Sequence, residues 1–362
     1  MTNSPCGRFR SLALSCILVL LCPLVQASDE TQIKLIFDAV RSQYPDVNLY
    51  CKLSDADRRK VVVQSTLQLA NKGQVSDPYV DGPKAGALLR QECGVLDIPT
   101  VDKATMRWMT NEKPLTFDSE VGRLGMFTSI QAMANRVYVP QEGTGPFPAV
   151  VLSHTIGSIS PHLLVHAKDL LAAGFAVLVV DTYGPRGVKN GISKILPTES
   201  AKDAYDALAH LQAQAFIDRN RIFQSGYSLG GIASSLLASP QGAKALNASG
   251  RFRATVSNYG GCVVSQMDVL SADSDRPLLM LMAELDIEAS PRLCFPLLDN
   301  MKAAGKDVQW HIYPQTTHGW DKAENNGYVY RSPSGETMPY RYDPTVAKDA
   351  TERMISFFNR YR

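Results

Sequence analysis

The sequence lacks an excess of charge of either sign. It holds 37 lysine and arginine residues against 35 aspartate and glutamate residues. Two of the basic residues, Arg8 and Arg10, lie before position 28, so the rest of the chain carries 35 charges of each sign. The densest basic cluster, Arg58-Arg59-Lys60, is typical of a solvated helix face. This balance predicts that nucleic acid is not a partner.

The apolar segment near the N-terminus is shorter than a typical membrane span. It runs from Leu12 to Val25, and Val25-Gln26-Ala27 supplies the small residues typical of a cleavage site. Neither Cys16 nor Cys22 follows the pair of small residues expected before a lipidated cysteine. We therefore predict that residues 1–27 are a signal peptide, with an uncleaved anchor as the alternative. The protein is expected to be exported, periplasmic or secreted, with no stable membrane anchor after cleavage.

Cysteine is scarce and follows no CxxC spacing. Three of the seven cysteines lie in the predicted signal peptide, and four remain: Cys51, Cys93, Cys262 and Cys294. An even number in an exported chain predicts disulfides, and four cysteines allow three pairings. Cys262 follows one predicted strand, and Cys294 begins the helix after the neighbouring strand, which favours a bridge between them and leaves Cys51 for Cys93. Two buried free thiols, or a metal site, are the alternatives; we predict no metal.

The most informative motif is G-x-S-x-G at residues 226–230. A short apolar run at 221–225 precedes it, and a helical stretch of small residues at 231–238 follows. Strand, tight turn and helix in this order are the nucleophile elbow of α/β-hydrolases. The motif predicts Ser228 as a nucleophile, with a glycine-rich turn as the alternative. Tyr227, beside the serine, is a possible substrate-binding residue.

Two further segments supply the acid and the base that a serine nucleophile requires. Asp286 follows the apolar strand predicted at 277–283, and it is preferred over Glu284, although it could instead cap the next helix. His318 lies in the loop after the strand predicted at 307–313. Both positions follow the carboxyl ends of strands, where open α/β sheets place their sites. The other histidines fall in predicted helices or at strands, and we interpret His162 and His166, spaced i, i+4, as helix surface or core.

An acyl-transfer enzyme also needs donors for the oxyanion. The backbone N–H of Leu229, the residue after the nucleophile, is the first expected donor. The second is expected from the loop after the strand at 149–153, where Ile156 is preferred over Thr155. Each such donor typically contributes about 3–4 kcal/mol of transition-state stabilisation.

From about Asn135 to Arg362 the sequence resembles the dienelactone hydrolase family of the α/β-hydrolases. The resemblance rests on Ser153-His154, with Thr155 in the usual glycine place, on residues 181–187 (DTYGPRG) and on the loop from Tyr313-Pro314 to His318-Gly319. Further matching positions are Asp203, Ala204, Ala207, Asp218 and Arg221-Ile222.

The resemblance has three implications for single residues. Family members that open dienelactones carry a cysteine nucleophile, so Ser228 looks like the broader carboxylesterase-type relatives. Arg186 would lie near the pocket, where it could hold a substrate carboxylate; the alternative is a structural arginine that ties down a loop. Exported relatives have a cysteine pair similar to Cys262 and Cys294.

The chain alternates predicted strands and helices after a mostly helical N-terminal extension at 28–115. We therefore expect an α/β-hydrolase domain at 116–362, with a mostly parallel sheet covered by helices on both faces. In the extension, Ser54 is expected to start a helix that stops near residues 71–73, and Pro83 and Gly94 bracket another. Strands are expected near 134–139, 148–153, 176–181, 221–225, 253–258, 277–283 and 307–313. Helices are expected near 162–173, 199–214, 229–239, 291–304 and 346–360.

The polar stretch at 321–343 directly follows His318 and is long for a loop. It could wall the pocket, with Tyr328, Tyr330, Tyr340 and Tyr342 as the residues involved, or decorate the surface.

Together these patterns predict an exported serine hydrolase that cleaves a small-molecule carboxylic ester without a cofactor. A lactone or dienelactone-type hydrolase is the alternative within enzymes, and a non-catalytic binding protein on the same fold is the alternative outside them. The oligomeric state and the natural substrate are not predicted.

Overall fold

The computed structural model describes residues 29–76, parts of 81–93, and residues 114–123, 129–188, 196–264, 267–270, 273–332 and 335–362. The predicted signal peptide lies outside the described residues, as does much of the second N-terminal helix expected between Pro83 and Gly94.

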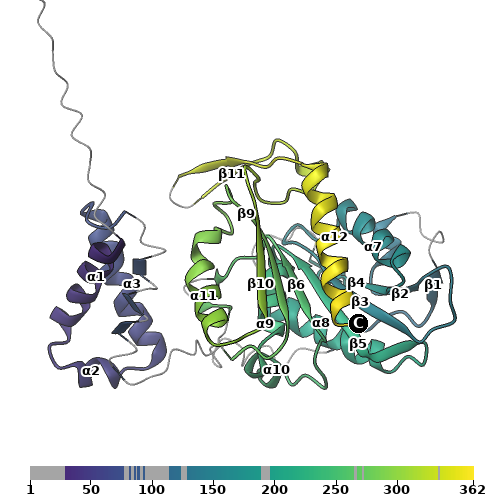
Figure 1. Ribbon diagram of the computed structural model, residues 1–362, viewed down its shortest axis with the longest axis horizontal. Helices are drawn as coiled ribbons and strands as arrows, with labels where there is room; N and C mark the ends of the chain where they lie inside the picture. Colours follow the sequence, from purple (N-terminus) through teal and green to yellow (C-terminus); the bar gives the residue numbers. More distant parts are fainter. Residues whose placement is uncertain are drawn as a thin grey trace, which may run out of the picture.

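One eight-stranded sheet forms the centre of the C-terminal part, in the order β1-β2-β4-β3-β5-β6-β9-β10 (Figure 1). From β4 to β10 all neighbours are parallel, whereas β2 runs antiparallel to β4 and β1 runs parallel to β2. The mostly parallel sheet predicted from the sequence is confirmed. The strands are Val121–Arg123 (β1), Val137–Val139 (β2), Phe147–Ser153 (β3), Ala176–Val180 (β4), Ile217–Tyr227 (β5), Thr255–Asn258 (β6), Leu278–Ala283 (β9) and Val308–Tyr313 (β10).

Helices cover both faces of this sheet. In β3, Val150 and Leu152 pack in one buried cluster, while Ala149 and Val151 pack in another on the opposite face. This alternation follows from the two-residue period of a strand, and burial of both faces explains the continuous apolar run. Helices α7 and α12 cover the first face, and α8 and α9 the second. The main helices are Pro161–Ala172 (α7), Pro197–Gln212 (α8), Leu229–Leu237 (α9), Phe295–Ala303 (α11) and Pro344–Arg360 (α12).

Several short elements complete the C-terminal part. The polar stretch after His318 contains a hairpin, in which β11 pairs antiparallel with β12. It lies near the start of α12 in Figure 1. The short elements are Ile130–Met133 (α6), Gly184–Arg186 (η2), Pro240–Ala245 (α10), Val263–Val264 (β7), Met267–Asp268 (β8), Pro291–Leu293 (η3), Ala323–Asn325 (η4), Val329–Arg331 (β11) and Thr337–Pro339 (β12).

The described N-terminal helices are α1 (Asp29–Gln43), α2 (Val47–Cys51) and α3 (Asp55–Asn71). The Ser54 hydroxyl accepts a hydrogen bond from the Asp57 N–H and so caps α3, as the sequence predicted. A buried apolar cluster drawn from this segment, including Ile36 and Val62, holds these helices together.

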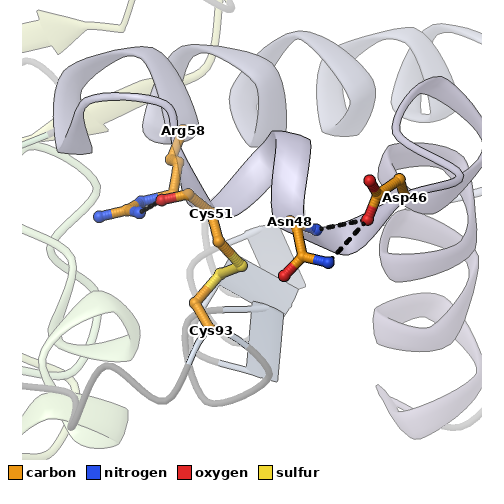
Figure 2. The surroundings of a disulfide bond; sticks show 5 residues. All are labelled: Asp46, Asn48, Cys51, Arg58 and Cys93. Carbon is orange, nitrogen blue, oxygen red and sulfur yellow. Dashed lines mark hydrogen bonds between the residues drawn. A yellow bond between two sulfur atoms is a disulfide. The ribbon is translucent and has the colours of Figure 1, made fainter.

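Both predicted disulfides are present. Cys51 bonds to Cys93, and the Arg58 guanidinium donates to the Cys51 carbonyl oxygen at 2.8 Å beside the bridge (Figure 2). Cys262 bonds to Cys294 and joins the loop after β6 to the start of α11. Across the described part of the chain, no helix combines the length and apolarity required to cross a membrane.

Candidate active site

Ser228 lies at a sharp turn between β5 and α9. Its backbone adopts φ +52° and ψ −111°, an unusual conformation for a residue other than glycine. A Cβ atom on Gly226 would collide with the backbone of Gly230, and one on Gly230 would collide with the carbonyl of Ser153. Both glycines are therefore required by the close approach of backbone segments. The Ser228 N–H donates to the Asn258 carbonyl at 3.0 Å, which fixes the turn against β6.

The loops after β9 and β10 bring a carboxylate and an imidazole to this serine. His318 Nε2 lies 2.9 Å from Ser228 Oγ, and His318 Nδ1 lies 2.7 Å from Asp286 Oδ2. The other Asp286 oxygen accepts two backbone N–H bonds, from Glu288 and Ala289, at 2.8 Å each. Because Nδ1 faces a carboxylate, it carries the proton, and Nε2 is left to accept the serine proton.

Glu284, the alternative acid, points elsewhere. Its carboxylate accepts the Gln315 N–H at 2.8 Å and thus ties the two loops together. The N–H of Leu285 donates to the Thr316 carbonyl at 3.0 Å and strengthens the same connection. The structure therefore brings Asp286, rather than Glu284, to the imidazole.

The charges around His318 favour its protonated form. Its side chain is buried, and burial alone would lower the pKa of His318. The hydrogen-bonded Asp286, with the charges of Glu288 and Asp321, outweighs that effect and raises the pKa above its ordinary value. The site thus stabilises the imidazolium that forms when His318 takes a proton.

The two segments expected to supply oxyanion donors both border the serine. Leu229 is the first residue of α9, so its N–H belongs to the helix N-terminus. Ile156 follows β3 in a tight turn, in which the Ser158 N–H donates to the Thr155 carbonyl at 3.0 Å. The Gly230 N–H donates to the His154 carbonyl at 3.1 Å and holds the two segments together. The turn after β3 and the start of α9 are therefore tied together beside Ser228.

The model of the dienelactone hydrolase family matches residues 133–362, which is more than half of the chain. The chain belongs to the dienelactone hydrolase family. Membership makes it a hydrolase that acts on esters. No curated protein sequence matches the chain.

Two solved structures illustrate what this family member is similar to. A candidate dienelactone hydrolase from Klebsiella pneumoniae subsp. pneumoniae shares 20% identity and a TM-score of 0.48, over 62% of this chain and 91% of that chain. The butyrate-bound esterase Est2 from Thermogutta terrifontis shares 14% identity and a TM-score of 0.48, over 62% of this chain and 88% of that chain.

Arg186 of this family member is held by protein groups. Its guanidinium binds Asp203 in a bidentate manner at 2.8 and 2.9 Å and donates to the Thr182 carbonyl at 2.7 Å. The Asp203 side chain is fully buried, so these contacts favour the structural alternative over recognition of a substrate carboxylate. Tyr227 is also buried, and its ring stacks on His166 with centroids 4.8 Å apart. That position favours a packing role.

A buried polar cluster behind the site was not anticipated. His166 Nε2 lies 2.8 Å from Asp321 Oδ2, and the Tyr259 hydroxyl donates to Asp321 Oδ1 at 2.8 Å. His162 and His166 are both buried on α7, which agrees with the core alternative for this pair. Within the described residues, no group of three histidine, cysteine, aspartate or glutamate side chains is placed to hold a metal ion.

Proposed function

We propose that this chain is an exported serine carboxylesterase that cleaves a small ester through Ser228, His318 and Asp286. The observation that carries the proposal is the continuous hydrogen-bonded chain from Ser228 Oγ to His318 and on to Asp286, at 2.9 and 2.7 Å. This order of nucleophile, base and orienting acid is the arrangement that activates a hydroxyl for attack on a carbonyl.

The proposed reaction proceeds in two steps. His318 accepts the Ser228 proton as the serine attacks the ester carbonyl, and it then donates that proton to the leaving alcohol. Backbone N–H groups of Leu229 and Ile156 stabilise the oxyanion, each contributing about 3–4 kcal/mol. Water activated by His318 then releases the acid from the acyl-enzyme. Asp286 holds the imidazole in the required tautomer throughout.

Export is supported by the cysteine chemistry. Both disulfides join cysteines that are far apart in the sequence, with separations of 42 and 32 residues. Disulfides of this kind persist in oxidising compartments and are rare in the cytosol. The predicted signal peptide at 1–27 leads to the same conclusion.

A cyclic ester is the second candidate substrate, and family membership is the observation that favours it. A lactone presents the same carbonyl to Ser228, but its alcohol stays attached after ring opening. Ser228 in place of the cysteine expected for dienelactones favours the open ester. A binding protein without activity is disfavoured, because it would have no need of the bonded triad.

Labelling and turnover together test the proposal. A fluorophosphonate probe should label the protein once, at Ser228, and Ser228→Ala should abolish both labelling and hydrolysis of short p-nitrophenyl esters. The matched control is Ser42→Ala, because Ser42 is an exposed serine on α1 and should not affect either readout. A parallel panel of lactones distinguishes the two substrate classes. Ester turnover retained by Ser228→Ala would refute the serine mechanism.

A further inference from the structure

Two tyrosine rings contact the imidazole of His318. The Tyr259 ring, from the loop after β6, meets it edge-on with centroids 4.9 Å apart and planes at 67°. The Tyr340 ring, directly after β12, lies 5.4 Å away with planes at 52°. Aromatic pairs at these separations and angles attract each other beyond their buried area. The imidazole is therefore restrained by ring contacts as well as by its hydrogen bonds.

Each of the two tyrosine hydroxyls donates to a carboxylate. Tyr259 binds Asp321, and Tyr340 makes a short hydrogen bond to Glu288. Glu288 lies two residues after Asp286, and its N–H donates to Asp286 Oδ1 at 2.8 Å. The Tyr340 side chain thus contacts the base with its ring and the acid loop with its hydroxyl.

Backbone hydrogen bonds and a ring contact fix Tyr340 on the hairpin. The Tyr340 N–H donates to the Tyr328 carbonyl at 2.7 Å, and its own carbonyl accepts the Gly327 N–H at 2.9 Å. The next N–H, from Arg341, donates to the Thr317 hydroxyl at 3.0 Å, beside His318. The Tyr328 ring packs edge-on against the Tyr340 ring at 5.2 Å. With only 7% of its surface exposed, Tyr340 is fixed on several sides.

We propose that Tyr340, anchored by Glu288, is a positioning residue that keeps the His318 ring aligned between Ser228 and Asp286. The inference rests on the proposed function, since it concerns the same proton transfer. Rotation of the imidazole would lengthen both of its hydrogen bonds, and misplacement of a reacting group by about 1 Å can cost on the order of 10²-fold in rate. Side chains held by a packed second layer avoid this loss.

Glu288 has a second effect on the same imidazole through its charge. The charges that act on the pKa of His318 include Asp286 and Glu288 on the acid loop and Asp321 on its own loop, and the phenols of Tyr259 and Tyr340 contact its ring. All three carboxylates raise the pKa of His318 against the opposing effect of burial. The ring of Tyr340 and the charge of Glu288 can therefore be separated by mutation, because one acts by contact and the other at a distance.

Four variants, measured with a p-nitrophenyl ester across pH 5 to 9, test the proposal. Tyr340→Leu removes the ring and should lower kcat by about 10- to 100-fold with little change in KM. Tyr340→Phe keeps the ring and should stay within about five-fold of wild type. Glu288→Gln can still accept the phenol hydrogen bond, so kcat should stay near wild type while the acid limb of kcat/KM shifts to lower pH. The control is Tyr361→Phe, because the Tyr361 hydroxyl binds Asp307, which precedes β10 and so lies at the end of that strand away from His318.

Each part of the proposal is overturned by a different result. Wild-type kcat in Tyr340→Leu would overturn the positioning role. Equal losses in Tyr340→Leu and Tyr340→Phe would overturn the role of the ring in favour of the hydroxyl that binds Glu288. An unmoved acid limb in Glu288→Gln would overturn the role of its charge. As a control, the thermal unfolding of each variant should be measured to show that it is folded at the assay temperature. The proposed function fails by a different result, namely ester turnover that is absent from wild type or retained by Ser228→Ala.

Discussion

Removal of the Asp321 carboxylate should destabilise the protein strongly, and its amide replacement should cost much less. The carboxylate is 3% exposed on its side chain and faces His166 Nε2 at 2.8 Å, while its other oxygen accepts the Tyr259 hydroxyl at 2.8 Å. Asp321→Ala leaves both partners buried without an acceptor. Asp321→Asn keeps the shape and two hydrogen-bonding atoms.

The His166 ring has a hydrogen-bond partner at each of its two nitrogens. The Thr351 hydroxyl donates its single proton to the Ala347 carbonyl at 3.0 Å, so it accepts from His166 Nδ1 at 2.9 Å. Nε2 faces a carboxylate and donates as well. The buried Asp321 carboxylate is therefore held by a charge-assisted hydrogen bond to His166.

The magnitude follows from the cost of breaking these hydrogen bonds. Asp321→Ala leaves two buried hydrogen-bonding groups without their acceptor, at about 1–3 kcal/mol each, so it should lower the free energy of unfolding by about 2–6 kcal/mol. In Asp321→Asn the imidazole can become neutral and accept from the amide, while the amide oxygen still accepts from Tyr259. The loss should then fall to about 1–2 kcal/mol. Urea unfolding at pH 7, with unchanged m-values, measures both.

The pH dependence gives an independent check. Burial would raise the pKa of Asp321, but the nearby imidazole of His162 and the hydrogen bonds from His166 and Tyr259 outweigh it and lower the pKa to about 2. A carboxylate whose pKa is lowered by folding contributes its full stabilisation above the pKa of the unfolded state, which is about 4. This contribution disappears as the pH falls toward 2. Wild type should therefore lose more stability than Asp321→Asn between about pH 4 and pH 2. Equal stabilities of the alanine and asparagine variants at pH 7 would refute the hydrogen-bonding role of Asp321.

Three further outcomes are expected. The apparent pKa of the acid limb of kcat/KM should lie above about 6.5, the ordinary histidine value. The reason is that the pKa of His318 is raised and the base must be neutral to act. An apparent pKa below that value would contradict the charge arrangement around His318. Replacing Cys262 and Cys294 by serine opens a 32-residue loop and should lower the unfolding free energy by about 4 kcal/mol and reduce activity, measured by denaturation and ester assay. Arg186→Leu should lower the unfolding free energy by about 3 kcal/mol, because it leaves the Asp203 carboxylate buried alone. The KM for neutral esters should be unchanged. A KM increase confined to carboxylate-bearing esters would instead indicate substrate recognition.

The fold could be predicted because the parallel strands are buried on both faces. The apolar run at 277–283 corresponds to β9, which starts one residue later and ends at the same residue. β5 was expected only at 221–225 but runs from Ile217 to Tyr227, because the polar residues 218–220 concealed its first half. β1, β11 and β12, of three residues each and largely exposed, were missed, because so short a segment shows no clear period. The equally short β2 is fully buried and was expected within 134–139.

The candidate site could likewise be predicted only in part. Ser228, Asp286 and His318 could be identified because each follows a strand whose carboxyl end is recognisable in the sequence. The bond between His166 and Asp321 joins positions 155 residues apart, and the bond between Tyr340 and Glu288 joins positions 52 apart. Such contacts depend on how α7, the acid loop and the hairpin pack, which no local pattern in the sequence specifies.

The turn that carries Ser228 has a practical consequence for identifying the natural substrate. No hydrogen bond of the serine hydroxyl caps α9, and the unusual backbone conformation is held instead by neighbouring main-chain bonds, such as the Ile232 N–H to the Ser228 carbonyl at 2.9 Å. Alanine at this position therefore removes the reacting atom and leaves the architecture of the turn intact. Immobilised Ser228→Ala protein would act as a trap that retains the physiological ester from a crude extract, ready for elution and mass analysis.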